Sequence, residues 1–188
     1  MSNLQIAAWV ELIVCWIAWS LAFVRPRQRA AGAVKKERAT VSRWGILLVM
    51  LGYACIWAFV RPVGVEKSTS SLIASMVLGP PSVLLVWVAA RHLDKQWRFE
   101  AALSEDHKLI TTGPYRWIRN PIYASMLGML LATGFAKTWW PMFVVGVVCF
   151  LIGTEIRVRA EERLLSARFG DEFAQYKGRT AAYFPFLR

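Results

Sequence analysis

The chain has 188 residues, of which 56% are hydrophobic and ten are tryptophan, with a mean hydropathy of +0.39 and a formal charge of +11 at neutral pH. Apolar residues make up about 45 to 50% of soluble globular domains, so this composition excludes an ordinary soluble domain and favours one multi-pass membrane domain over residues 1–188. The basic charge is also compatible with nucleic-acid binding, so the distribution of the charge has to decide between these classes.

Five apolar segments approach the length of about 17 to 25 residues that a transmembrane helix needs. They are residues 4–24, 44–60, 72–90, 122–136 and 139–154. The last two are short and are expected to form a tight hairpin around Lys137 and Thr138. The predicted fold class is an all-α integral membrane protein with five transmembrane helices and a cytoplasmic C-terminal helical segment.

The loops on one side of these segments, together with the tail, carry 20 of the 23 Lys and Arg residues. The positive-inside rule places that side in the cytoplasm and the N-terminus outside. This explains the basic charge without nucleic acid. The first segment lacks a basic start and is followed by RPRQRAAGAVKKER, a stop-transfer pattern, so we expect it to stay in the membrane rather than be cleaved as a signal peptide.

Small residues predict where these helices pack. In the second segment, Gly45 and Gly52 are seven residues apart, a spacing that allows another helix to approach closely. In the fourth segment, Ala124, Gly128 and Ala132 share one helical face. We expect that face to pack against the fifth segment.

Few polar side chains lie inside the apolar segments. Glu11 is a candidate functional carboxylate, although hydration near the outer interface is the simpler interpretation. The three cysteines lie within apolar segments, form no CxxC pair and are expected to act as small hydrophobic residues. His92 and His107 are the only histidines, and neither is next to a cysteine or another histidine, so no metal site is predicted.

Residues 107–123, HKLITTGPYRWIRNPIY, form the longest polar and aromatic stretch between apolar segments. Gly113-Pro114 predicts a turn, and Asn120-Pro121 predicts a break before a helix whose first residue is Pro121. A helix N-terminus presents unpaired N–H groups and a positive dipole, which favour a carboxylate or phosphate. With its arginines and aromatic residues, the stretch is expected to hold a ligand with an anionic end and an aromatic ring.

The fifth segment is expected to continue as a helix into the cytoplasm as far as Gly170, followed by a short amphipathic turn. On this helix Arg157 and Glu161 are four residues apart and share a face, either as a structural ion pair or as a functional pair. The order of the two charges is the less favourable one for a structural pair. Neighbouring Glu162, Arg159 and Arg163 are interpreted as a solvated charge run.

The stretch HKLITTGPYRWIRNPIY, an apolar hairpin and then RVRAEERLLSARFGDEFAQYKGRTAAYFP resemble the isoprenylcysteine carboxyl methyltransferase family and its prokaryotic relatives, which share features with phospholipid methyltransferases. The resemblance covers the C-terminal half of the chain. It implies an all-helical membrane methyltransferase whose cofactor is S-adenosylmethionine and whose acceptor is a lipophilic or prenylated molecule from the bilayer. Residues 1–93 would hold three transmembrane helices, 94–121 the cytoplasmic cofactor loop, 122–157 the last two helices, and 158–188 the cytoplasmic tail.

The resemblance also assigns roles to residues. It places the cofactor against His107, Lys108, Leu109, Ile110, Tyr115, Arg119, Asn120, Pro121 and Glu161. Arg157 matches the arginine that is thought to orient the substrate carboxylate, so Arg157 and Glu161 are the expected catalytic residues. The family's Arg-His-Pro is Arg119-Asn120-Pro121 here. If the family's His contributes only its backbone to the site, Asn120 changes nothing. If it contributes its imidazole, the replacement by Asn120 would alter the chemistry with the acceptor.

Carboxyl O-methylation of an isoprenylcysteine-like acceptor is the preferred prediction. A phospholipid amine is an alternative acceptor, for which Glu162 or Tyr123 would take the proton, and another hydrophobic acid or a thiol is a third. A non-catalytic transporter or assembly protein that keeps the motif is the alternative outside enzymes. The sequence does not determine the oligomeric state.

Overall fold

The computed structural model describes residues 2–24, 40–59, 67–93 and 109–183, and within these ranges every regular element is a helix. In chain order they are α1 (Asn3–Leu21), α2 (Thr40–Ala58), α3 (Thr69–Leu93), η2 (Gly113–Arg116), α4 (Pro121–Lys137) and α5 (Trp140–Arg179). A capping box between Ser2 and Gln5 begins α1. Pro121 begins α4 as its first residue, the position where a missing N–H costs least.

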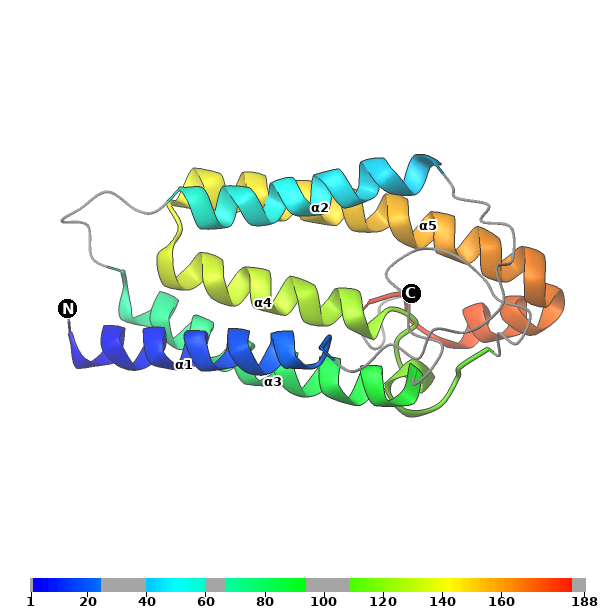
Figure 1. The fold of residues 1–188 in the computed structure, drawn as a ribbon, viewed down its shortest axis with the longest axis horizontal. Helices are drawn as coiled ribbons and strands as arrows, with labels where there is room; N and C mark the ends of the chain where they lie inside the picture. Colours follow the sequence, from blue (N-terminus) through cyan, green and yellow to red (C-terminus); the bar gives the residue numbers. More distant parts are fainter. Residues whose placement is uncertain (1, 25–39, 60–66, 94–108, 184–188) are drawn as a thin grey trace.

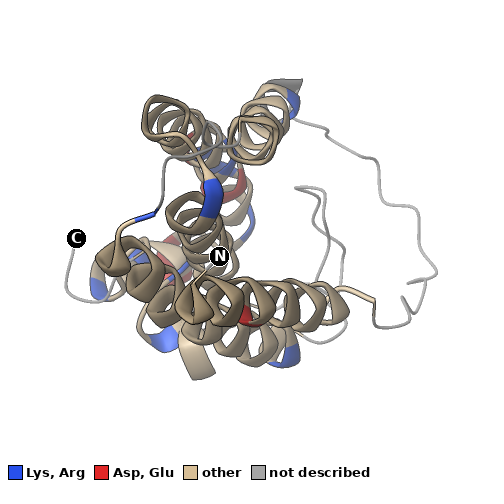
Figure 2. Ribbon diagram, turned by 90° about the vertical axis from the view of Figure 1, so that its left-hand side faces the viewer, with Lys and Arg blue, Asp and Glu red and all other residues tan. Residues whose placement is uncertain are grey.

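The five long helices form a bundle with α4 at its centre (Figure 1). Helix α2 packs along α5, α3 packs along α4, and α1 packs on α3. Seen end-on in Figure 2, the α2 and α5 pair lies on one side of α4, and α1 and α3 lie on the other. Helix α4 therefore connects the two halves of the bundle.

Helices α2 and α5 meet through two pairs of glycines. A Cβ atom on Gly45 would lie 2.8 Å from the carbonyl oxygen of Gly153, and a Cβ atom on Gly52 would lie 2.7 Å from that of Gly146. Backbone atoms on both sides leave no room for a side chain at these crossings. The predicted close approach at Gly45 and Gly52 is confirmed, and the structure identifies α5 as the approaching helix.

Replacing Gly52 with alanine is expected to destabilise the bundle, because the added methyl group meets backbone rather than a flexible side chain. Overpacking of this kind costs about 1 to 3 kcal/mol. The matched control is Gly178→Ala, since among the described residues no atom beyond the local helix backbone lies within 4 Å of a Cβ at that position. Thermal unfolding in detergent should show a lower midpoint for Gly52→Ala only, and equal midpoints for the two variants would contradict the packing.

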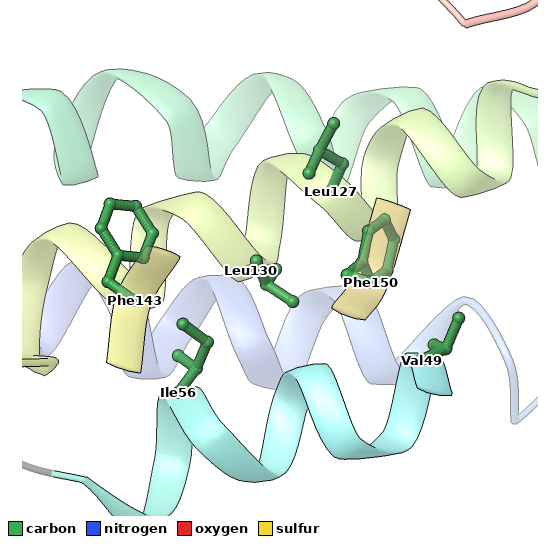
Figure 3. Close-up of a cluster of buried hydrophobic side chains, with 6 residues drawn as sticks. All are labelled: Val49, Ile56, Leu127, Leu130, Phe143 and Phe150. Atoms are coloured by element: carbon green, nitrogen blue, oxygen red, sulfur yellow. The ribbon is translucent and has the colours of Figure 1, made fainter. Parts of the chain in front are cut away.

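The core between the two halves is apolar and comes from three helices. Figure 3 shows side chains from α2, α4 and α5 pointing toward one another. They are Val49, Ile56, Leu127, Leu130, Phe143 and Phe150. The large residues of α4 thus face α2 and α5.

The small residues of α4 face elsewhere. A Cβ atom on Gly128 would collide with Ser82 of α3, and Ala132 clusters with Leu12 of α1. The prediction that this face packs against the fifth apolar segment is therefore wrong at Gly128 and Ala132. The physical reason is that α4 is apolar on all sides, so its small residues mark where a helix comes close but not which helix it is.

Three of the described helices, α1, α3 and α5, are long and apolar enough to cross a membrane, and α2 contributes a shorter apolar helix over Arg43–Ala58. Large apolar side chains on α1, including Ile13 and Ile17, face outward with more than half of their surface exposed. The all-α membrane fold is confirmed, and helices occupy all five predicted segments. The structure supports three spans by length and composition, so the five-span topology stays a prediction.

Helix α5 continues beyond its apolar part, residues 140–154, as predicted. Gly170 has φ +50°, a conformation that glycine adopts without strain, and the helix axis breaks there. The chain then continues in helical form to Arg179, with Phe173 and Tyr176 buried. The break turns the last helical segment back toward the bundle, where it contacts the stretch before α4.

Candidate active site

Three elements meet at the end of the bundle where α4 begins: η2, the first turn of α4, and α5 beyond its apolar part (Figure 1). The residues before α4 pair with the C-terminal segment. The N–H of Arg119 donates to the carbonyl of Ala181 at 2.8 Å, and both the N–H and the side-chain amide of Asn120 donate to the carbonyl of Ala182 at 3.1 Å. Asn120 therefore directs its side chain to the tail, and within the described residues it makes no capping hydrogen bond to the N-terminus of α4.

The first turn of α4 and the polar part of α5 are joined by three side chains. Arg157 Nε donates to the hydroxyl of Tyr123 at 2.6 Å, and that hydroxyl donates to Glu161 Oε1 at 2.6 Å. Arg157 Nη2 also reaches Glu161 Oε1, at 3.3 Å. The predicted pair of Arg157 and Glu161 is thus an ion pair on one helix, but one that shares a tyrosine from another helix. We call these three residues the Tyr123 triad.

Glu161 has one carboxylate oxygen committed to the triad and one that is open. Within the described part of the chain, Oε2 makes no hydrogen bond, and 30% of the side chain is exposed. Burial raises the pKa of Glu161, and the hydrogen bond from Tyr123 and the charge of Arg157 oppose that rise. The open oxygen is an acceptor suited to a cationic group of a ligand.

A second set of ion pairs ties the stretch before α4 to the tail. Arg119 Nε donates to Glu162 Oε1 at 3.0 Å, and Lys177 Nζ donates to Glu162 Oε2 at 2.6 Å. Arg119 Nη1 donates to the carbonyls of Lys177 and Thr180. The side chain of Glu162 is 15% exposed, so its interpretation as part of a solvated charge run is wrong, whereas Arg159 is 71% exposed and fits it.

Removing the charge of Glu162 should loosen the C-terminal segment, because Arg119 and Lys177 would lose their shared carboxylate. Of these two pairs, the one between Arg119 and Glu162 is largely buried, and breaking a buried pair costs about 3 to 5 kcal/mol. A Glu162→Gln variant is expected to be cleaved faster after residue 170 in limited proteolysis than an Arg159→Ala variant, which loses only an exposed pair. Equal cleavage rates would show that the ion pairs do not hold this segment.

Tyr115 on η2 supplies a buried polar atom that no other described residue satisfies. The residue is 7% exposed, and among the described residues its hydroxyl makes no hydrogen bond. Its carbonyl accepts a hydrogen bond from Tyr176 at 2.7 Å, which fixes η2 against the last helical segment. Burial, followed by the nearby Tyr176 and Glu161, raises the pKa of Tyr115. A buried hydroxyl without a partner costs free energy, so a ligand atom at this point would stabilise it.

Several predicted site residues lie together at this end of the bundle. Described residues predicted to contact the cofactor lie on η2, at the start of α4 or on α5, or just before η2: Leu109, Ile110, Tyr115, Arg119, Asn120, Pro121 and Glu161. His107 and Lys108 lie outside the described residues. The guanidinium of Arg119 is directed to Glu162 and the tail. Its cofactor contact stays a prediction.

The sequence suggested Tyr123 and Glu162 only as groups that would take a proton from an amine acceptor. It did not predict the contacts of Tyr123 with Arg157 and Glu161, or the ion pairs of Glu162. The only available signal was the spacing of Tyr123 two residues after Pro121, which places its hydroxyl in the first turn of α4. Within the described residues, no group of three or more His, Cys, Asp and Glu side chains is placed to hold a metal ion.

Comparison with known families decides the class of protein. The sequence model of the phospholipid methyltransferase family matches residues 69–172, more than half of the chain. The chain belongs to the phospholipid methyltransferase family. The family match spans α3, η2, α4 and most of α5, and it includes the Tyr123 triad and Tyr115. The predicted resemblance to membrane methyltransferases of this kind is confirmed at the level of the family.

Two curated relatives share part of the sequence. The chain is 34% identical over 83 residues to the cobalt-zinc-cadmium resistance protein CzcN of Cupriavidus metallidurans, a match that covers 44% of this chain and 38% of that protein. It is 32% identical over 80 residues to the nickel-cobalt-cadmium resistance protein NccN of Alcaligenes xylosoxydans xylosoxydans, covering 43% of this chain and 37% of that protein. The matches span less than two fifths of the length of each relative.

Proposed function

We propose that this member of the phospholipid methyltransferase family is an S-adenosylmethionine-dependent enzyme that methylates a lipophilic acceptor taken from the bilayer. The Tyr123 triad carries the proposal. It combines a guanidinium that is mostly buried with a carboxylate that has one open oxygen, at the polar end of an apolar bundle. Such a pair serves a reaction between a cationic cofactor and an anionic acceptor.

The residues at the site fit the cofactor. Its carboxylate suits the uncapped N-terminus of α4, its α-amino group suits the open oxygen of Glu161, and a hydrogen-bonding group suits the buried hydroxyl of Tyr115. Leu109 and Ile110, both half-buried, would contribute apolar surface. When bound, S-adenosylmethionine supplies a methyl group that its sulfonium already activates. The protein therefore has to align the two reactants and exclude water.

A carboxylate is the acceptor group that we propose, as in an isoprenylcysteine-like molecule. A carboxylate carries no proton that must leave before methylation, so the site needs only a cation to orient it. Arg157 is that cation, and its contact with Tyr123 fixes the plane of the guanidinium.

A phospholipid amine is the second candidate, and the description of the family favours it. An amine has to lose a proton, which Glu161 would accept through the hydroxyl of Tyr123. Glu162 is less suited to that task because Arg119 and Lys177 hold both of its oxygens.

The proposed topology has five crossings, with the N-terminus outside and both the site and the C-terminus in the cytoplasm. The charge distribution and the three long apolar helices support it. A phosphatase reporter that is active only outside the cytoplasm is expected to be inactive when fused after Arg188, whereas the same reporter placed before the first helix should be active. The opposite pattern would overturn the orientation.

The enzymatic proposal is tested by methyl transfer from radiolabelled S-adenosylmethionine in membranes that contain the protein. N-acetyl-S-farnesylcysteine represents the carboxylate acceptor and phosphatidylethanolamine the amine acceptor. Labelling of the first alone supports carboxyl methylation, and labelling of the second alone supports the amine alternative. Absence of both labelling and binding of S-adenosylhomocysteine in the folded protein would favour a non-catalytic membrane protein.

A further inference from the structure

The hydroxyl of Tyr123 is the point where the two halves of the proposed site meet. Arg157 Nε can only donate a hydrogen bond, so the oxygen of Tyr123 must accept there. The phenolic hydrogen is then directed to Glu161 Oε1. For an ionised Glu161, the chemistry of the two partners therefore fixes the direction of both hydrogen bonds.

This arrangement sets the orientation of two other side chains. Glu161 Oε1 accepts from Tyr123 and Arg157, which turns Oε2 away from the triad. The guanidinium of Arg157 lies 5.8 Å from the centre of the Tyr123 ring, so both the ring and the hydroxyl contact it. Tyr123 belongs to α4, whereas the other two residues belong to α5. The tyrosine therefore fixes the α5 side chains relative to the N-terminus of α4.

We propose that Tyr123 is a positioning residue that orients Glu161 toward the cofactor and Arg157 toward the acceptor through one hydroxyl. The inference rests on the proposed function and deepens it, because it names the group that couples the cofactor half of the site to the acceptor half. Tyr123 itself need not touch either reactant.

The charge of Glu161, and with it the binding of a cationic group, depends on pH. Among the described residues, the groups that face Glu161 are Tyr123 from α4, Arg157 from α5, Tyr115 from η2 and Tyr183 from the tail. Burial raises the pKa of Glu161, while the Tyr123 hydrogen bond lowers it. Binding of a cationic amino group needs the ionised carboxylate, so affinity is lost as pH falls through this pKa. Removing the hydroxyl moves that loss to higher pH.

The experiment is calorimetric titration of S-adenosylhomocysteine into the detergent-purified full chain from about pH 5 to pH 8, a range in which the ligand's own carboxylate stays ionised. Affinity plotted against pH should fall on the acidic side, and we call this fall the acidic limb. Tyr123→Phe keeps the ring and is expected to move the acidic limb to higher pH by about one unit, the effect of one lost hydrogen bond to a charged group. Tyr183→Phe is the matched control, because that hydroxyl donates to Glu155 instead. Its acidic limb should stay in place.

Replacing Tyr123 with 3-fluorotyrosine tests the same point without loss of the hydroxyl. The fluorinated phenol is a stronger donor, so the acidic limb should move to lower pH than in the wild type. Unchanged limbs in both Tyr123 variants would overturn the positioning role and leave the proposed function in place. Failure of the folded wild type to bind S-adenosylhomocysteine at any pH would overturn both.

Discussion

A Glu161→Gln variant is expected to bind S-adenosylhomocysteine at least tenfold more weakly than the wild type at neutral pH. Glutamine keeps the shape of the side chain and can accept the hydrogen bond of Tyr123, but it removes the negative charge that the open Oε2 offers to the amino group of the ligand. A hydrogen bond to a charged group contributes about 1.5 to 3 kcal/mol, which corresponds to roughly 10- to 100-fold in affinity. Calorimetric titration measures the difference directly.

The matched control is Glu155→Gln on the same helix. Glu155 pairs with the exposed Arg159 at 2.7 Å and accepts a hydrogen bond from Tyr183, and it lies outside the Tyr123 triad. This variant should bind the ligand as the wild type does. If Glu161→Gln also binds normally, Glu161 does not contact the cofactor.

Arg157→Lys is expected to reduce kcat/KM for the acceptor by about 10- to 100-fold while changing affinity for S-adenosylhomocysteine less than threefold. Lysine keeps the positive charge and most of the aliphatic stem, and that stem matters because a Cβ on Gly45 would lie 2.7 Å from Arg157 Cγ. Lysine lacks the planar fork that contacts Tyr123 and Glu161 together. The acceptor carboxylate would then keep a counter-charge but lose its fixed orientation.

Steady-state kinetics with varied acceptor and varied cofactor separates these effects. Arg159→Ala serves as the control for loss of a positive charge on the same helix, since the Arg159 side chain is 71% exposed. Similar losses of cofactor affinity and acceptor kcat/KM in Arg157→Lys would assign Arg157 to the stability of the whole site. A selective loss on the acceptor side supports its orienting role.

The position of the candidate site along the chain could be predicted from the sequence more completely than the side-chain contacts within it. Asn120-Pro121 marks the start of α4, and the four-residue spacing of Arg157 and Glu161 places both on one face of α5. These are local features, encoded within one turn of helix. The contacts that complete the site join residues 34 to 43 positions apart: Tyr123 with Arg157, Tyr123 with Glu161, and Arg119 with Glu162. No local pattern specifies such pairs.

The sequence by itself determined the helices, the apolar segments and the two sites of close approach at Gly45 and Gly52. These features depend on hydrophobicity and residue size, which are local properties of the chain. Only the tertiary structure decided which helix each face contacts. Gly128 meets α3 rather than α5, and Glu162 is mostly covered by its ion pair with Arg119 rather than solvated. An apolar helix face can pack against any other apolar face, so its sequence does not specify the partner helix. A charged side chain is exposed or buried according to the neighbour that packing brings to it.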